Sequence, residues 1–157
     1  MHDGNQVYFL NHRSKNYEIR HLHITIWRDH SAPKDPDAVI AVYRELLGDQ
    51  PKTPIVIHCS AGVGRTCTFV GGLLLLERIL ERDNPSGVVV INEMRKRRFG
   101  AVQRSSQFVF MHYVLMELFC QVRNHTTFFT VNDVVGVEIN LFTLLDLSYF
   151  TMFSMLW

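Results

Sequence analysis

The most informative stretch of the sequence is His58-Cys59-Ser60-Ala61-Gly62-Val63-Gly64-Arg65-Thr66. The five residues between Cys59 and Arg65 are enough to curl a loop around one tetrahedral oxyanion, with successive backbone N–H groups pointing inward. Gly62 and Gly64 suit a turn that needs a positive φ and lets a ligand approach the backbone closely. Arg65 offers a planar fork that matches two phosphate oxygens, and the helix that follows adds the positive end of its dipole. The stretch therefore predicts a phosphate-binding loop at residues 58–66, called the phosphate loop below.

The same loop is expected to activate Cys59 as a nucleophile. Inward amides and a helix N-terminus stabilise negative charge, so a thiol with an ordinary pKa of ~8.5 becomes a thiolate at neutral pH. A cysteine and an arginine at this spacing would alone be a weak signal, because such pairs occur by chance in many proteins. Nine specified positions at a predicted strand-to-helix junction are much more specific.

The segments around the loop predict a strand before it and a long helix after it. Residues 54–58 form an apolar run without alternation, which is typical of a strand buried on both faces. Residues 66–82 predict an apolar helix, in which Gly71 and Gly72 are expected to permit close packing of helix against sheet.

Two runs near the N-terminus predict a β-hairpin. Residues 6–10 are apolar-rich. The pattern resumes from Tyr17, and Leu22, Ile24 and Ile26 alternate with polar residues, a period of two that favours a strand. The tip of the hairpin is expected at residues 12–15.

Three further segments bear on the helical content. Pro36 and Asp37 predict the start of a helix that ends at Gly48. Residues 88–97 are ambiguous, because their valines favour a strand and the charged residues that follow favour a helix. Ser105 or Ser106 is expected to cap a last helix, whose apolar residues recur at three- and four-residue steps to Val122.

The composition limits the classes of function. A chain of 157 residues with 47% hydrophobic residues is enough for one domain with a core. A net charge of +1 provides no long-range field for nucleic acid or an acidic membrane surface. Three cysteines without a C-x-x-C pair favour a reducing, intracellular setting, and no signal peptide is expected at the N-terminus.

The last segment, residues 126–157, differs from the rest of the chain. It is rich in Phe and Leu, and its charged residues are Asp133, Glu138 and Asp146. Its longest charge-free stretch, residues 147–157, is shorter than the ~20 apolar residues of a membrane-spanning helix. We expect a hydrophobic tail of unknown role that packs on the domain or stays disordered, in preference to a membrane anchor.

The phosphate loop resembles the signature loop of the classical protein tyrosine phosphatases, His-Cys-Ser-x-Gly-x-Gly-Arg-Ser/Thr. Two more segments are similar to motifs of that family, in the expected order. Residues 27–33, Trp-Arg-Asp-His-Ser-Ala-Pro, resemble its mobile Trp-Pro-Asp loop and are called the Asp29 loop below. Residues 102–108, Val-Gln-Arg-Ser-Ser-Gln-Phe, resemble its glutamine loop. The resemblance covers residues 17–122, and the glutamine loop distinguishes this family from dual-specificity phosphatases.

The resemblance implies phosphotyrosine hydrolysis through a phosphocysteine intermediate. Cys59 would attack phosphorus while Arg65 and the loop amides hold the phosphoryl oxygens, and Asp29 would protonate the leaving tyrosyl oxygen. The substrate-binding positions would be Ser60, Ala61, Gly62, Val63, Gly64, Arg65 and Gln107.

The second step would use further residues of the same motifs. Gln103 would position the hydrolytic water with help from Gln107, Asp29 would act as its base, and Thr66 would donate a hydrogen bond to the departing sulfur. His58 would support the loop and tune the thiolate. The resemblance implies no metal and no cofactor, partners that contain phosphotyrosine, and a cytoplasmic location, alone or as part of a longer receptor.

The implied fold is α/β: a truncated phosphatase fold with a twisted mixed sheet flanked by helices and the strand–loop–helix unit at its centre. Residues 1–125 would form part of the catalytic domain, without the family's N-terminal strands and phosphotyrosine-stacking loop. In addition, Arg28 replaces the proline of the mobile loop. Both departures favour an alternative, a weak or inactive phosphotyrosine-binding pseudophosphatase or fragment.

Two other groups of residues allow either a structural or a functional interpretation. His21 and His23 could form half of a metal site, but ordinary histidines are the better expectation because no acidic or cysteine companion is evident. The basic run at residues 95–98 could attract phosphopeptides or acidic lipid; we expect instead a solvated face beside the site, with Arg98 structural.

Overall fold

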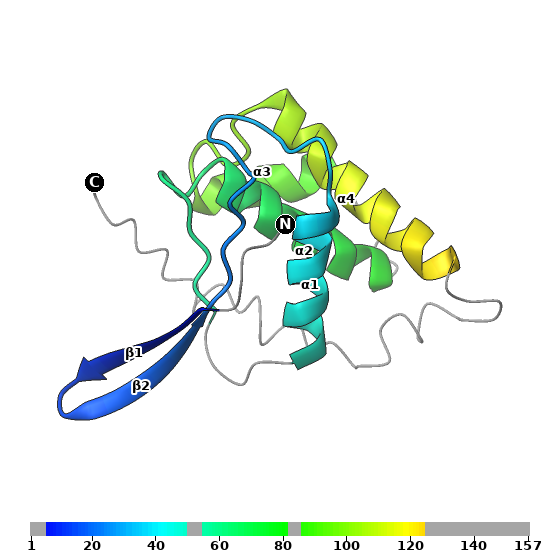
Figure 1. The fold of residues 1–157 in the computed structure, drawn as a ribbon. Helices are drawn as coiled ribbons and strands as arrows, with labels where there is room; N and C mark the ends of the chain where they lie inside the picture. Colours follow the sequence, from blue (N-terminus) through cyan, green and yellow to red (C-terminus); the bar gives the residue numbers. More distant parts are fainter. Residues whose placement is uncertain (1–5, 50–54, 82–85, 125–157) are drawn as a thin grey trace.

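The computed structural model describes residues 6–49, 55–81 and 86–124, which form one antiparallel hairpin and four helices. The hairpin consists of β1 (Gln6–His12) and β2 (Lys15–His21), paired from Gln6↔His21 to His12↔Lys15. Arg13 and Ser14 both have a positive φ, of 48° and 63°, as a two-residue hairpin turn requires. The hairpin and its tip are therefore confirmed. Figure 1 shows it projecting from one end of the helical body.

The second strand was expected to run from Tyr17 through Ile26, and its continuation over residues 22–26 is wrong, because β2 ends at His21. Leu22 and Ile24 pack against the core from an irregular segment. The alternation in the sequence therefore reflects one-sided burial without strand pairing. An ion pair between Arg20 and Glu45 joins the hairpin to the first helix.

The helices are α1 (Asp37–Asp49), α2 (Arg65–Leu80), α3 (Gly87–Arg97) and α4 (Ser105–Asn124). The predictions of α1, α2 and α4 are confirmed within a few residues. The ambiguity at residues 88–97 is resolved as helix: the Ser86 side chain caps it by accepting from the Val89 N–H, and three basic residues lie in its last turn.

The core lies around α2, which packs against α3 and α4 while α1 packs against α4 (Figure 1). Tyr43 of α1 meets Phe69 edge to face at 4.6 Å and donates its hydroxyl to the Phe69 carbonyl at 2.6 Å. That hydroxyl lies where a Cβ on Gly72 would be, and the sulfur of Met111 lies 2.9 Å from the same position on Gly71. The two glycines do permit close packing, but their partners are helices rather than a sheet.

The strand expected at residues 54–58 is also wrong: residue 54 lies outside the described residues, residues 55–58 carry no strand, and Val56 is 67% exposed. A strand exists only with a neighbour to share its hydrogen bonds, and the sheet in the described residues is limited to β1 and β2. The α/β class is confirmed, with a smaller sheet than expected. The tail at residues 126–157 lies outside the described residues. None of the described helices is long and apolar enough to cross a membrane.

Candidate active site

The phosphate loop leads directly into α2 and is shaped by its two glycines for different reasons. Gly62 has a φ of +68°, which confirms the expected left-handed turn. Gly64 has a φ of −85°, outside the left-handed region, so glycine is needed here because there is no room for a side chain. A Cβ at this position would lie 2.6 Å from Oε1 of Gln103. The carbonyl of Gly64 accepts hydrogen bonds from the backbone N–H and the hydroxyl of Thr68, both at 2.9 Å. The glutamine loop therefore packs directly on the phosphate loop.

The environment of Cys59 favours its thiolate. Partial burial raises the pKa of the thiol, but the hydroxyl and backbone N–H of Thr66, the backbone of Gly62 and the charge of Arg65 outweigh it, so the pKa lies below that of free cysteine. The Thr66 hydroxyl is buried and makes no hydrogen bond of ordinary geometry to a described group. A thiolate at Cys59 is the acceptor beside it.

We expect alkylation of Cys59 by iodoacetamide to become fast at a lower pH than alkylation of free cysteine, which titrates at ~8.5. Only the thiolate reacts, so a lowered pKa moves the rise in rate toward acid. Cys67 is an internal control, because burial raises its pKa to about 11 and should keep it unmodified at neutral pH. The check is peptide mass mapping after short pulses across a pH series; a rise for Cys59 at or above that of free cysteine would contradict an ionised sulfur.

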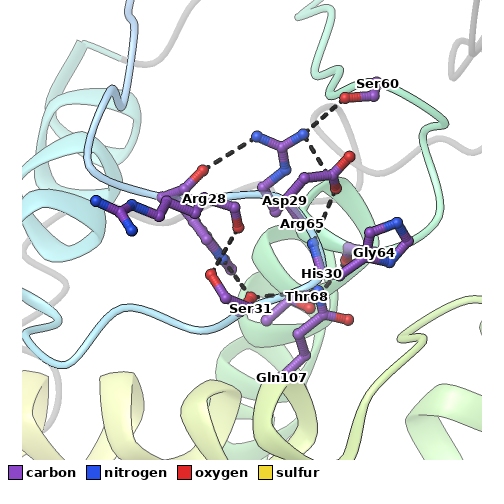
Figure 2. Close-up of polar contacts among 10 residues, drawn as sticks. Arg28, Asp29, His30, Ser31, Ser60, Gly64, Arg65, Thr68 and Gln107 are labelled. Atoms are coloured by element: carbon purple, nitrogen blue, oxygen red, sulfur yellow. Dashed lines mark hydrogen bonds and ion pairs between the residues drawn. The ribbon is translucent and has the colours of Figure 1, made fainter.

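Arg65 is held in place by three groups (Figure 2). Its Nη1 donates to the Trp27 carbonyl at 3.0 Å, and its Nη2 donates to the Ser60 hydroxyl at 2.7 Å and lies 3.2 Å from Oδ1 of Asp29. Its Nε is buried without a hydrogen-bond partner among the described groups. Leaving such a donor unsatisfied costs ~1–3 kcal/mol. An anion in the loop would satisfy it, as it would the amides that line the turn.

The Asp29 loop is anchored at its buried tryptophan. Trp27 packs edge to face on Phe110 at 5.2 Å, and its indole N–H donates to the Ser31 carbonyl at 2.8 Å. The Ser31 hydroxyl donates to the Arg28 carbonyl at 2.7 Å, which closes a tight turn around Asp29 (Figure 2). The turn places the Asp29 carboxylate beside Arg65 of the phosphate loop.

The carboxylate of Asp29 is ionised in this arrangement. Desolvation raises its pKa, but the His30 N–H at 3.0 Å and the charge of Arg65 outweigh it, so the pKa lies below its ordinary value. Asp29 therefore lies beside Arg65 of the phosphate loop as an ionised carboxylate.

Gln107 connects two of the loops and is fully buried. Its Oε1 accepts from the backbone N–H groups of Gln103 and Arg104, at 3.1 and 3.2 Å, and its Nε2 donates to the Ser31 carbonyl at 3.3 Å. A glutamine that reaches back to the N-terminal amides of its own helix is a capping arrangement. Gln107 thus positions the Asp29 loop; its contact with substrate stays a prediction, whereas the exposed Gln103 lies over Gly64.

Two arginines of the basic run at residues 95–98 donate hydrogen bonds to backbone carbonyls of the phosphate loop and of residues 101–102. Arg98 donates to the Ala61 carbonyl at 2.9 Å, which confirms its structural role, and Arg95 donates to the carbonyls of Ala101 and Val102 at 3.0 and 3.2 Å. Val102 has a φ of +59°, and its N–H bonds to the Val63 carbonyl at 2.9 Å. Neither Arg95 nor Val102 was predicted from the sequence to hold a loop in place. Arg95 lies in the last turn of α3 and Arg98 is the extended residue that follows the helix.

The remaining residues singled out from the sequence are His58 and the pair His21 and His23. His58 has an exposed side chain, and its predicted role stays a prediction. The rings of His21 and His23 stack at 5.6 Å. Among the described residues, no group of three or more His, Cys, Asp or Glu side chains could hold a metal ion.

A family model described as "Protein-tyrosine phosphatase" matches residues 5–117 of the chain. The chain belongs to the protein-tyrosine phosphatase family. The resemblance of the three loops is thereby confirmed, and with it the hydrolase class of the family. Named relatives include both receptor-type and non-receptor phosphatases.

Three curated phosphatases illustrate the similarity. The identity is 37% over 106 residues with receptor-type tyrosine-protein phosphatase V of Rattus norvegicus, 37% over 103 residues with receptor-type tyrosine-protein phosphatase C of Homo sapiens, and 31% over 104 residues with tyrosine-protein phosphatase non-receptor type 20 of Rattus norvegicus. These matches cover 65%, 64% and 66% of this chain but only 6%, 8% and 25% of those proteins.

Two solved phosphatase structures confirm the fold. The chain matches TcPTP1 of Trypanosoma cruzi with a TM-score of 0.59 at 29% identity, covering 83% of this chain and 42% of that one. It matches TbPTP1 of Trypanosoma brucei with a TM-score of 0.60 at 24% identity, covering 85% and 45%. The phosphatase fold described above thus spans less than half of either solved phosphatase.

Proposed function

We propose that this chain hydrolyses phosphotyrosine in proteins through a phosphocysteine intermediate on Cys59. The observation that carries the proposal is the phosphate loop itself. It combines a thiol of lowered pKa, with the Thr66 hydroxyl beside its sulfur, and a buried donor that has no partner among the described groups, Nε of Arg65. These groups lie in one turn at a helix N-terminus, where an oxyanion is favoured.

In the first step, the Cys59 thiolate attacks phosphorus, so that an S–P bond forms and the P–O bond to tyrosine breaks. Arg65 and the amides of the loop hold the equatorial oxygens, where charge develops in the transition state. Asp29 gives its proton to the leaving phenolic oxygen. The products of this step are the free tyrosine side chain and phosphocysteine.

The pairing of Asp29 with Arg65 describes the state before substrate binds. A phosphate dianion on Arg65 would replace the carboxylate there and add negative charge beside it. Both effects raise the pKa of Asp29, because they remove a stabilising cation and add a like charge. Binding of substrate would thereby convert Asp29 from a base into the required acid.

In the second step, water attacks the phosphocysteine and the S–P bond breaks, which releases inorganic phosphate. Asp29, now ionised, takes the proton of the water, and Gln103 orients that water from its position over Gly64. The Thr66 hydroxyl, buried beside the sulfur, stabilises the departing thiolate.

A second candidate function is capture of phosphotyrosine without efficient turnover. It is favoured by the ion pair that holds Asp29 ionised and by Arg28 at the position of the family's loop proline. Both candidates bind at the same loop, and they differ only in whether the S–P bond forms and is hydrolysed.

The test is phosphate release by the purified chain from one peptide sequence carrying phosphotyrosine or phosphoserine. Hydrolysis of the phosphotyrosyl peptide alone is the result expected of the enzyme. Saturable binding of that peptide with no phosphate release identifies the capture function, and neither binding nor release would overturn both.

Replacing Arg28 by proline is expected to raise kcat several-fold. Proline fixes φ near −65° and so reduces the conformational freedom that the Asp29 loop loses when it closes, a gain of about 0.4–1 kcal/mol. The Arg28 carbonyl that Ser31 bonds to is kept in the variant. Steady-state kinetics of both proteins with a small aryl phosphate measures the change.

Arg28→Ala is the matched control, because it removes the exposed charge without fixing φ. It should leave kcat near that of the parent chain. An unchanged or lower kcat in Arg28→Pro contradicts the role of loop closure, and an equal rise in Arg28→Ala assigns the effect to charge.

We further propose that residues 1–125 act as part of a catalytic domain on the cytoplasmic side of the membrane or free in the cytoplasm. The relatives with receptor-type and non-receptor names support either arrangement. Proteins that carry phosphotyrosine are the corresponding partners.

A further inference from the structure

The side of α4 that faces away from the core is apolar. Its members are Val109, Tyr113 and Met116, which are 63%, 42% and 66% exposed, and Cys120, which is also exposed. Steps of four, three and four residues place these side chains in one line along the helix, called the α4 stripe below. The outward face of a surface helix is usually polar, so the α4 stripe requires a partner.

The other sides of α4 are already occupied. Val114, Leu115 and Leu118 are buried in the core. Gln121 lies beside Arg44 and Asp37 of α1. His112 lies against Gly87 at the start of α3, where Val88 and Val89 are also exposed. Figure 1 shows α4 along the outer edge of the helical body. Among the described residues, the α4 stripe is the exposed side of this helix.

The C-terminal segment has the composition to cover this surface. Nineteen of the residues at 126–157 are apolar, three are acidic, and none is Lys or Arg. This proportion of apolar residues is much higher than that of segments that remain solvated, which are poor in such residues and highly charged. The acidic character disfavours an anionic lipid surface, which attracts Lys and Arg.

The position of the segment also fits. It begins two residues after α4 ends at Asn124, and Cys120 lies one turn before that end. The α4 stripe is about 17 Å long at 1.5 Å per residue, whereas 32 extended residues reach about 100 Å. A tethered segment has an effective concentration on the order of millimolar, far above that of a second copy in dilute solution.

We propose that the α4 stripe is the docking site of residues 126–157 of the same chain. The tail thereby takes the place of an external partner on α4. Its role is to cover an apolar helix face next to the phosphatase fold, independently of the chemistry of the phosphate loop.

The test uses Cys120 as a built-in probe in the full chain. Cys59→Ser removes the activated thiol, and Cys67 is buried, so a bulky water-soluble maleimide reports on Cys120. We expect Cys120 of the full chain to react at least about tenfold more slowly than Cys120 of a tail variant. The maleimide reaches Cys120 only while the tail is undocked, so the reaction rate is proportional to the undocked fraction, which we expect to be less than a tenth. The tail variant carries Phe142→Ser, Leu145→Ser, Phe150→Ser and Phe153→Ser, and its matched control carries Thr130→Ser, Thr143→Ser and Thr151→Ser.

Equal rates in the full chain and the tail variant would overturn the proposal. Protection that disappears on dilution, together with a dimer in sedimentation, would assign the α4 stripe to a second copy and also overturn it. Protection that requires added phospholipid vesicles would overturn it in favour of a membrane.

A second pair of variants tests the same contact from the α4 side. Tyr113→Asp with Met116→Asp should release the tail and speed its cleavage by chymotrypsin about tenfold, since cleavage follows the open fraction. Val7→Asp with Ile19→Asp is the control, because it changes two exposed apolar residues on the hairpin instead. Equal cleavage of the tail in the two variants would overturn the proposal.

Discussion

Cys59→Ser is expected to lower kcat for a phosphotyrosyl peptide by at least about 10⁴-fold, in line with the loss of a nucleophile in other covalent enzymes. A serine hydroxyl remains protonated at neutral pH, so the groups that lower the pKa of the Cys59 thiol no longer produce an ionised nucleophile. Phosphate release under single-turnover conditions measures the effect.

Two comparisons make this result specific. Cys120→Ser removes an exposed thiol away from the phosphate loop and should leave kcat unchanged. Cys59→Ser should still bind the phosphotyrosyl peptide, because Arg65 and the loop amides remain. Residual turnover within tenfold of the parent chain would contradict a nucleophilic role for Cys59.

Arg65→Lys is expected to lower kcat/KM by about 10²–10³-fold, the range seen when one donor to a developing oxyanion is removed. Lysine keeps the positive charge but loses the planar fork that joins the Trp27 carbonyl, Ser60 and Asp29. It also removes the unsatisfied Nε that an oxyanion would engage. Steady-state kinetics with a small aryl phosphate measures the loss.

Arg78→Lys is the matched control for the exchange of arginine for lysine. Arg78 bonds Glu93 on the far side of α2, so its replacement should leave kcat/KM near that of the parent chain. A loss in Arg65→Lys no larger than in Arg78→Lys would show that charge alone, without the fork, serves the site.

The local features of this fold could be predicted from the sequence because local chemistry determines them. The turn at Gly62 and the start of α1 after Pro36 follow from backbone preferences of single residues. The periodicity of α4 was predicted in the same way, since its buried residues repeat with the helical turn. The same pattern also contained the α4 stripe, which became visible only once the buried side was known.

The errors concern features that depend on distant partners. Residues 22–26 and 55–58 have strand-like composition, but a strand also needs a neighbour that the sequence does not identify. The pairing of Asp29 with Arg65 joins residues 36 positions apart, and its effect on the protonation of Asp29 follows only from their distance. Arg95 was expected on a solvated face, but it donates to the carbonyls of Ala101 and Val102, whereas the structural role expected of Arg98 is confirmed.

The most direct test of the account is to trap the intermediate on the full chain. A phosphotyrosyl peptide labelled with radioactive phosphate is mixed with the protein, and the reaction is quenched in acid. The protein is then digested, and the fragment of the protein that carries the label is identified by mass spectrometry. The account predicts label on Cys59, at a higher level when Gln103→Ala slows hydrolysis of the S–P bond. Phosphate release without label on Cys59 in either protein would contradict it.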